Sequence, residues 1–141
     1  MLIGKYYHHL EANGRLSLPA KFRAVNKDWI ATRGLDGCLF LLPESNFKKE
    51  LEKIAQSSLT KKANRDLLRL MTNEAQEINA DENGRVNLPD YLIKFAQLKN
   101  NLVIVGSLNH LEVWDQEKYH QYIDQIEDQA ESIAESIILD D

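Results

Sequence analysis

Two arginines occupy the same place in two copies of one short motif. Arg15 and Arg85 each follow an Asn-Gly pair, and an acidic residue, Glu11 or Asp81, stands four positions earlier. Asn-Gly is a strong signal for a β-hairpin turn, which would hold both arginines near a hairpin tip. There a forked guanidinium could bind O6 and N7 of a guanine in a DNA major groove, with about 1–3 kcal/mol of discrimination. The alternative is a surface salt bridge worth about 0–1 kcal/mol, which the residues alone slightly favour.

The geometry of the turn bears on this choice. A two-residue loop of type I′ would place Arg15 opposite Ala12 and point Glu11 to the other face of the pleat. The acid could then accept turn amides and leave the arginine free. Asn13 and Asn83 are expected as turn residues first and as base contacts second. Three further bases flank the first motif and could either clamp phosphates or form a solvated face: Lys5, Lys21 and Arg23.

The other reactive residue types predict neither an enzyme nor a metal site. His8 and His9 are adjacent, so in a strand they point to opposite faces and cannot readily share one ion. Cys38 is the one cysteine of the chain, and its apolar surroundings indicate a small core residue. The sequence contains no Ser-His-Asp arrangement, glycine-rich phosphate loop or carboxylate dyad. We therefore expect no catalytic residue, no metal and no cofactor.

The charge of the chain is unevenly distributed. The net charge is −5, but residues 115–141 hold nine acids and one base, whereas residues 1–114 hold 16 bases and 13 acids. The acidic tail is interpreted first as a solvated helix face, so the charge permits a DNA surface in the front part. The sequence shows no apolar run of membrane-spanning length and no signal-peptide pattern. With the lone cysteine, this predicts a cytoplasmic protein.

An internal repeat organises the chain. Residues 11–19 align with residues 81–89, and five of the nine positions are identical. After a two-residue shift, six downstream positions of the first copy match six of the second. Ile30, Thr32, Gly34, Leu39, Leu41 and Phe47 align with Leu102, Ile104, Gly106, Leu111, Val113 and Tyr119. A copy of about 45 residues is near the lower limit for a core of its own. We therefore expect the copies to interleave their strands around one core, with approximate two-fold symmetry.

Each copy has the same predicted elements. An extended segment leads to the Asn-Gly turn and a short strand over residues 15–18 or 85–88, and Pro19 or Pro89 precedes a short helix. Two strands follow, over 29–33 and 38–42 or 102–106 and 111–114, and then an amphipathic helix. Residues 60–75 predict a linking helix. The apolar run Ile133, Ala134, Ile137 and Ile138 could cover the module, contact a neighbouring subunit or fray.

The segments GKYYHHLEANGRLSLPAKFR, DENGRVNLP and VGSLNHLEVWD resemble the MraZ family of bacterial transcriptional regulators. The resemblance covers nearly the whole chain and implies an α+β fold, with two tandem swapped-hairpin β-barrel modules of the SpoVT–AbrB type. It divides the chain into a first repeat (5–47), linking helices (48–75), a second repeat (76–119) and an acidic C-terminal helix or tail (120–141). The family signature is Asp-x-x-x-Arg. Asp81 and Arg85 match it, whereas Glu11 replaces the aspartate before Arg15.

The resemblance also implies a function and partners. It predicts a non-enzymatic, sequence-specific DNA-binding regulator associated with the nucleoid. Such a protein would bind direct repeats upstream of the division and cell-wall gene cluster as a ring-like homo-oligomer, without a membrane or small-molecule substrate. The resemblance favours DNA contact for Arg15. For Arg85 it leaves DNA contact and a surface salt bridge evenly balanced. The alternative function is a structural or protein-interaction module that forms rings without binding specific DNA.

Overall fold

A computed structural model of the chain describes residues 1–137, and its elements repeat in order. The first repeat contains β1 (Leu2–His9), β2 (Arg15–Ser17), α1 (Ala20–Arg23), β3 (Asp28–Arg33), β4 (Leu39–Pro43) and α2 (Glu44–Gln56). The second contains β5 (Gln76–Asn79), β6 (Arg85–Asn87), α4 (Asp90–Phe95), β7 (Asn101–Leu108), β8 (Leu111–Asp115) and α5 (Gln116–Glu127). Helix α3 (Lys62–Asn73) links the two, α6 (Ala130–Ser136) follows α5, and a 3₁₀ turn, η1, spans Ala12–Gly14.

Strands of the two repeats alternate in space. A six-stranded antiparallel sheet has the order β1-β7-β8-β4-β3-β5, and β2 pairs with β6 in a separate ribbon. The order is symmetric about the β4–β8 pair, because each strand of one repeat has its counterpart on the other side. Thus β1 pairs with β7 of the second repeat, and β5 pairs with β3 of the first. The predicted α+β fold with interleaved, swapped strands and pseudo-two-fold symmetry is confirmed.

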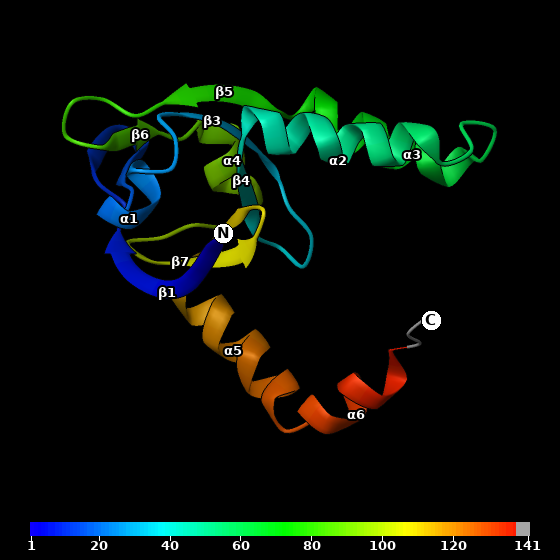
Figure 1. Cartoon of the computed structure of the whole chain (residues 1–141). Coiled ribbons are helices and arrows are strands. Elements are labelled where there is room, and N and C mark those ends of the chain that lie inside the picture. Colours follow the sequence, from blue (N-terminus) through cyan, green and yellow to red (C-terminus); the bar gives the residue numbers. More distant parts are fainter. Residues whose placement is uncertain (138–141) are drawn as a thin grey trace.

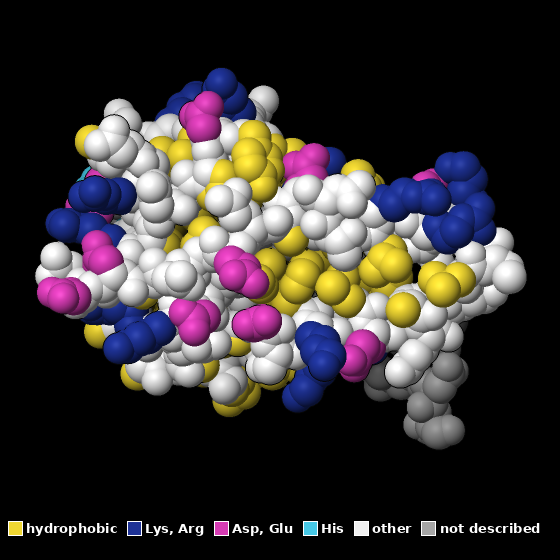
Figure 2. Space-filling view, turned by 90° about the horizontal axis from the view of Figure 1, so that it is seen from above, with side chains coloured by type: hydrophobic (Ala, Val, Ile, Leu, Met, Phe, Trp, Pro, Cys, Tyr) yellow, Lys and Arg dark blue, Asp and Glu magenta, His cyan; other side chains and the backbone are white. Residues whose placement is uncertain are grey.

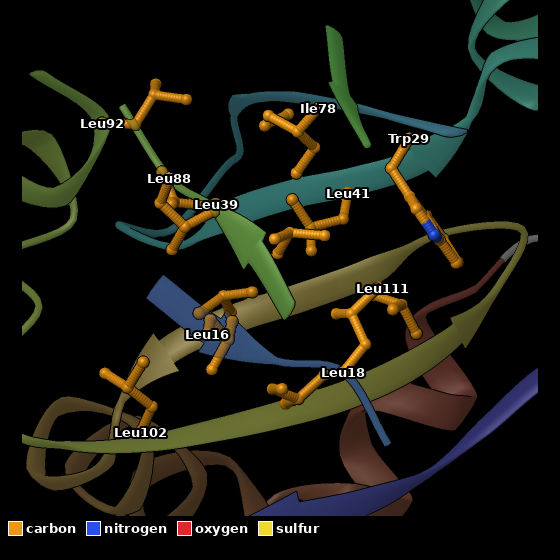
Figure 3. Close-up of a cluster of buried hydrophobic side chains, with 14 of the residues drawn as sticks. Leu16, Leu18, Trp29, Leu39, Leu41, Ile78, Leu88, Leu92, Leu102 and Leu111 are labelled. Carbon is orange, nitrogen blue, oxygen red and sulfur yellow. The ribbon is translucent and has the colours of Figure 1, made fainter. Parts of the chain in front are cut away.

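The ribbon and the sheet enclose one shared core. Leu16 of β2 and Val86 of β6 face each other in the ribbon and are almost completely buried. They pack with Leu39, Leu41 and Leu111 of the sheet, and with Leu18 and Leu88, which directly follow the ribbon strands. Figure 3 shows the leucine side chains of this cluster between the strands of both repeats. Burial of this cluster requires both repeats, which explains why a single copy is not enough.

The hairpin turns differ from the predicted two-residue loop. The Glu11 amide donates to the Arg15 carbonyl at 2.8 Å, and the Asp81 amide donates to the Arg85 carbonyl at 2.9 Å. Three residues therefore lie between the paired positions, and the predicted pairing of Arg15 with Ala12 is wrong. Gly84 has φ 77° and Gly14 has φ 75°, the left-handed conformation that a three-residue hairpin loop requires at its last position.

The predicted alignment of the third strands is also wrong by one residue. Ile30 pairs with Leu42 in the first repeat, and Val103 pairs with Trp114, the counterpart of Leu42, in the second. Ile30 therefore corresponds to Val103 and not to Leu102. Since successive side chains of a strand point to opposite faces, Leu102 lies in the main core while Val103 lies on the outer side of the sheet. The alignment of β4 with β8 is correct.

Two helical arms leave the sheet. Helices α2 and α3 form an antiparallel pair that extends away from the ribbon, and α5 continues into α6 on the other side of the sheet (Figure 1). Helix α3 confirms the predicted linking helix. None of the helices in residues 1–137 is long and apolar enough to cross a membrane. Ile138, the last residue of the predicted apolar run, lies outside the described residues.

Candidate nucleic-acid interface

The β2–β6 ribbon presents a polar face to solvent. Arg15 pairs with Asn87, Leu16 with Val86, and Ser17 with Arg85. Because side chains alternate along a strand, the buried central pair leaves the four flanking side chains on the outer face. Arg15 and Asn87 are exposed, and Ser17 and Arg85 are partly exposed. A two-stranded ribbon is one of the elements that fit a DNA major groove, so this face has a suitable form for reading base edges.

Ser17 and Asn87 were not among the sequence-predicted site residues. Each stands two positions after an arginine, with a buried apolar residue between them. That period-two pattern was a usable signal, because it places the residue on the same face as the arginine. They add a hydroxyl and an amide to the two guanidinium groups of this face.

Asp81 stabilises the second turn from within. Its Oδ1 accepts the backbone amides of Asn83 at 2.8 Å and of Arg85 at 2.9 Å. The Arg85 amide is the largest cause that holds the pKa of Asp81 below its ordinary value, and the Asn83 amide acts in the same direction. For Asp81 the expectation that the acid accepts turn amides is confirmed.

Glu11 behaves differently from Asp81. No side-chain hydrogen bond caps the first turn, and the Glu11 carboxylate instead lies 3.1 Å from Nε of Arg85 in the other repeat. The N–H is not directed at this oxygen, so the contact is an ion pair without a hydrogen bond. The salt bridge expected within a motif therefore forms between the two motifs.

The two arginines are consequently not equivalent. Arg85 is partly buried against Glu11, whereas Arg15 is exposed and makes no ion pair or hydrogen bond with any part of residues 1–137. Both remain on the same ribbon face. The Arg15 charge helps to lower the pKa of Asp81 in the other repeat, but no hydrogen bond or ion pair within residues 1–137 holds its guanidinium, which can therefore bind an external ligand.

Arg23 braces the second turn. Its Nη1 donates to the Asn83 carbonyl at 3.1 Å, and its side chain lies directly over Gly84, where an added Cβ would approach its Cδ to 2.0 Å. The counterpart contact places Ile93 against Gly14. Each short helix thus contacts the turn of the other repeat, and a side chain at Gly84 would be strained by its φ of 77° and would displace Arg23.

The remaining predicted residues lie in two places. Asn13 is exposed in the first turn with φ 63°, and Lys21 is exposed on α1, directly after the ribbon. Lys5 lies opposite Val105 in the β1–β7 pair, with its ammonium 6.0 Å from the ring centre of Tyr119 on α5. The structure therefore places Asn13 in the turn before Arg15 and Lys21 on the short helix that follows the ribbon, but leaves Lys5 beside α5.

No metal or nucleophilic site accompanies this face. Residues 1–137 contain no group of three histidine, cysteine or acidic side chains placed to hold a metal ion. Cys38 is buried, and burial raises the pKa of its thiol well above the ordinary range, which leaves it unreactive.

The comparisons with known proteins decide the family. The family model described as MraZ protein matches the chain twice, over residues 1–70 and 71–141. The chain belongs to the MraZ family. It is 41% identical over 139 residues to the transcriptional regulator MraZ of Natranaerobius thermophilus and 37% identical over 139 residues to that of Pediococcus pentosaceus. Each alignment covers 98% of this chain and 97% of the relative. The two MraZ matches divide the chain between its two repeats.

The turn acid of this MraZ chain gives a first prediction. Replacing Asp81 with alanine removes the acceptor of two turn amides, so we expect a lower midpoint of thermal unfolding at neutral pH. Because the pKa of Asp81 is depressed in the folded state, its contribution is present above its ordinary value of 3.8 and is lost as pH falls through the folded pKa. The difference between wild type and Asp81→Ala should therefore shrink on acidification. A difference that is constant down to low pH would contradict this role, and Glu82→Ala, an exposed neighbour, is the control.

Proposed function

We propose that this chain is a sequence-specific DNA-binding transcriptional regulator whose β2–β6 ribbon enters the major groove. The observation that supports this most is Arg15, an exposed guanidinium with no hydrogen bond or ion pair in residues 1–137, on a ribbon that packs on the shared core. Guanine is the base whose O6 and N7 fit this fork. Ser17, Asn87 and Asn13 supply neighbouring polar contacts, and Lys21 contacts phosphate.

Arg85 and Arg23 have dual roles in this proposal. Glu11 neutralises Arg85 in the free protein, so Arg85 contacts DNA only when that pair opens. Arg23 holds the Asn83 turn through Nη1 and offers its other terminal nitrogen, Nη2, to phosphate. Lys5 is the weakest DNA candidate because it lies beside α5.

A single ribbon buries little surface, so affinity should depend on several ribbons binding together. The proposed DNA is a set of direct repeats upstream of the division and cell-wall gene cluster, bound by a ring-like homo-oligomer in the cytoplasm at the nucleoid. Simultaneous binding to spaced repeats raises overall affinity without any new contact. The relatives named transcriptional regulators support regulation of transcription as the purpose.

The competing function is a ring-forming interaction module without DNA specificity. Fluorescence anisotropy with promoter DNA that contains spaced repeats, against a shuffled control, separates the two. We expect tighter binding to the repeats and a steep loss of affinity with salt, because phosphate contacts release counterions. Equal weak binding to both DNAs would favour the interaction module.

The Glu11–Arg85 pair gives a second prediction. Replacing Glu11 with glutamine removes a negative charge from the ribbon and frees Arg85, so we expect tighter DNA binding and a steeper salt dependence. The control is Glu52→Gln, which removes an exposed carboxylate from α2. Unchanged or weaker DNA binding by Glu11→Gln would show that Arg85 does not reach DNA.

A further inference from the structure

The outer face of the sheet is covered by different helices in the two repeats. In the first repeat, α3 lies beside α2 and closes a small apolar cluster. Met71 of α3 is buried there with Ile30, Leu42 and Phe47. The Met71 carbonyl also accepts the Thr32 hydroxyl at 2.9 Å, which fixes the helix over β3. Helix α3 therefore completes the outer face of the first repeat.

The equivalent place in the second repeat is open. Val103, Trp114 and Tyr119 are the counterparts of Ile30, Leu42 and Phe47, and they form a cluster beneath α5. Within residues 1–137 no helix takes the position of α3. A hollow of about 340 Å³ remains between α5, β1 and β7, with Tyr122 and Ile126 of α5 on its wall. We name this hollow the α5 groove.

Part of the apolar side of α3 is left uncovered by its own chain, where Leu67 and Leu70 border a hollow that Met71 also lines. Leu67 and Leu70 are 36% and 46% exposed, and Leu59 before the helix is 50% exposed. Figure 2 shows hydrophobic side chains in a row along the α2–α3 arm, with lysine and arginine side chains gathered at its end. A row of this kind is typical of a surface that is covered in an assembly.

The two arms carry opposite charge. Residues 61–73, with α3, hold four bases, Lys61, Lys62, Arg65 and Arg69, against one acid. Residues 116–136, with α5 and α6, hold six acids, Glu117, Asp124, Glu127, Asp128, Glu131 and Glu135, against one base. The charge difference therefore distinguishes an α3 surface from an α5–α6 surface.

We propose that α3 of one copy packs into the α5 groove of a second copy. The internal repeat supports α3 as the helix that fills the groove, because α3 already covers the equivalent site in its own chain. The exposed leucines would cover the apolar wall, and the basic arm would face the acidic one. This inference rests on the proposed homo-oligomer and specifies its contact. The contact is head to tail, since the two joined surfaces differ, and it therefore forms closed rings or open filaments and not an isolated two-fold dimer.

Charge reversal on each arm tests the contact. Sedimentation velocity of the full chain at low salt, without DNA, should show multimers of the wild type. Lys61→Glu with Lys62→Glu and Arg69→Glu, and separately Asp124→Lys with Glu127→Lys and Glu131→Lys, should each weaken self-association more than about tenfold, because like charges then face each other. Lys48→Glu with Lys49→Glu and Lys53→Glu, on the exposed side of α2, is the matched control and should assemble like the wild type.

Mixing the two reversed chains is the decisive step. One then carries two acidic arms and the other two basic arms, so the mixture should regain multimers that neither forms alone. Recovery also shows that both variants are folded. A monomeric wild type, reversed chains that keep their mass, or a mixture that stays dissociated would each overturn the proposal. A preference of the dissociated variants for repeat DNA over shuffled DNA tests the proposed function separately, since each copy keeps its ribbon.

Discussion

Replacing Arg15 with alanine is expected to lower the affinity for repeat DNA by about 5- to 150-fold for each ribbon that binds. This range corresponds to the loss of about 1–3 kcal/mol of guanine recognition. Arg15 has no ion pair or hydrogen bond within residues 1–137, so the substitution should leave the midpoint of thermal unfolding nearly unchanged. Binding to shuffled DNA should fall far less. Competition anisotropy with the two DNAs measures both quantities.

Two control variants sharpen this result. Arg15→Lys keeps the positive charge but removes the fork, so non-specific binding should survive while the preference for the repeats is lost. Lys48→Ala removes an exposed charge from α2 and should change neither quantity. If Arg15→Ala retained the full preference for repeat DNA, its assigned role would be wrong.

The second large effect concerns the base of the ribbon. Leu16 is completely buried opposite Val86, and it packs between the ribbon and the sheet (Figure 3). Leu16→Ala should therefore lower the free energy of unfolding by about 2–5 kcal/mol through lost burial and a cavity. Because this residue joins both repeats, the whole chain should unfold in one transition at lower urea concentration.

An exposed leucine provides the comparison for this variant. Leu35 is 58% exposed in the β3–β4 connection, so Leu35→Ala should change the free energy of unfolding by less than about 0.5 kcal/mol. Urea unfolding followed by tryptophan fluorescence measures both variants. Two separate transitions in Leu16→Ala would contradict a single shared core.

The sequence predicts the fold well where a signal is local or repeated. The recurrence of Asn-Gly-Arg and Leu-Pro identifies the duplicated unit, and the apolar spacing identifies the helices. The size of one unit predicts that the strands interleave. The pairing of the strands depends on tertiary contacts. An alignment of the two repeats across short connections can therefore be wrong by one residue. Five residues separate the paired Arg33 and Leu39, whereas four separate Gly106 and Leu111, and this difference shifts Ile30 onto Val103.

The candidate site is less predictable than the fold, because the difference between its two arginines depends on residues that are distant in the sequence. Arg15 and Arg85 look equivalent in the sequence, and the structure separates them only through Glu11, which reaches across the pseudo-two-fold axis. The same holds for Arg23, whose partner Asn83 is sixty residues away in the chain. Lys5 is close to the motif in sequence, but an extended strand carries it to α5. A residue that is close to the motif in sequence can therefore lie beside a different element in space.

A tethered cleavage reagent tests directly whether the outer face of the β2–β6 ribbon lies in the DNA groove. An iron chelate can be attached to Ser17→Cys, in the middle of that face, in a Cys38→Ala background. The control carries it at Ser57→Cys, in the connection after α2. We predict strand cleavage centred on the repeats from position 17 and none above background from position 57. Cleavage from position 57 with none from position 17 would contradict this account.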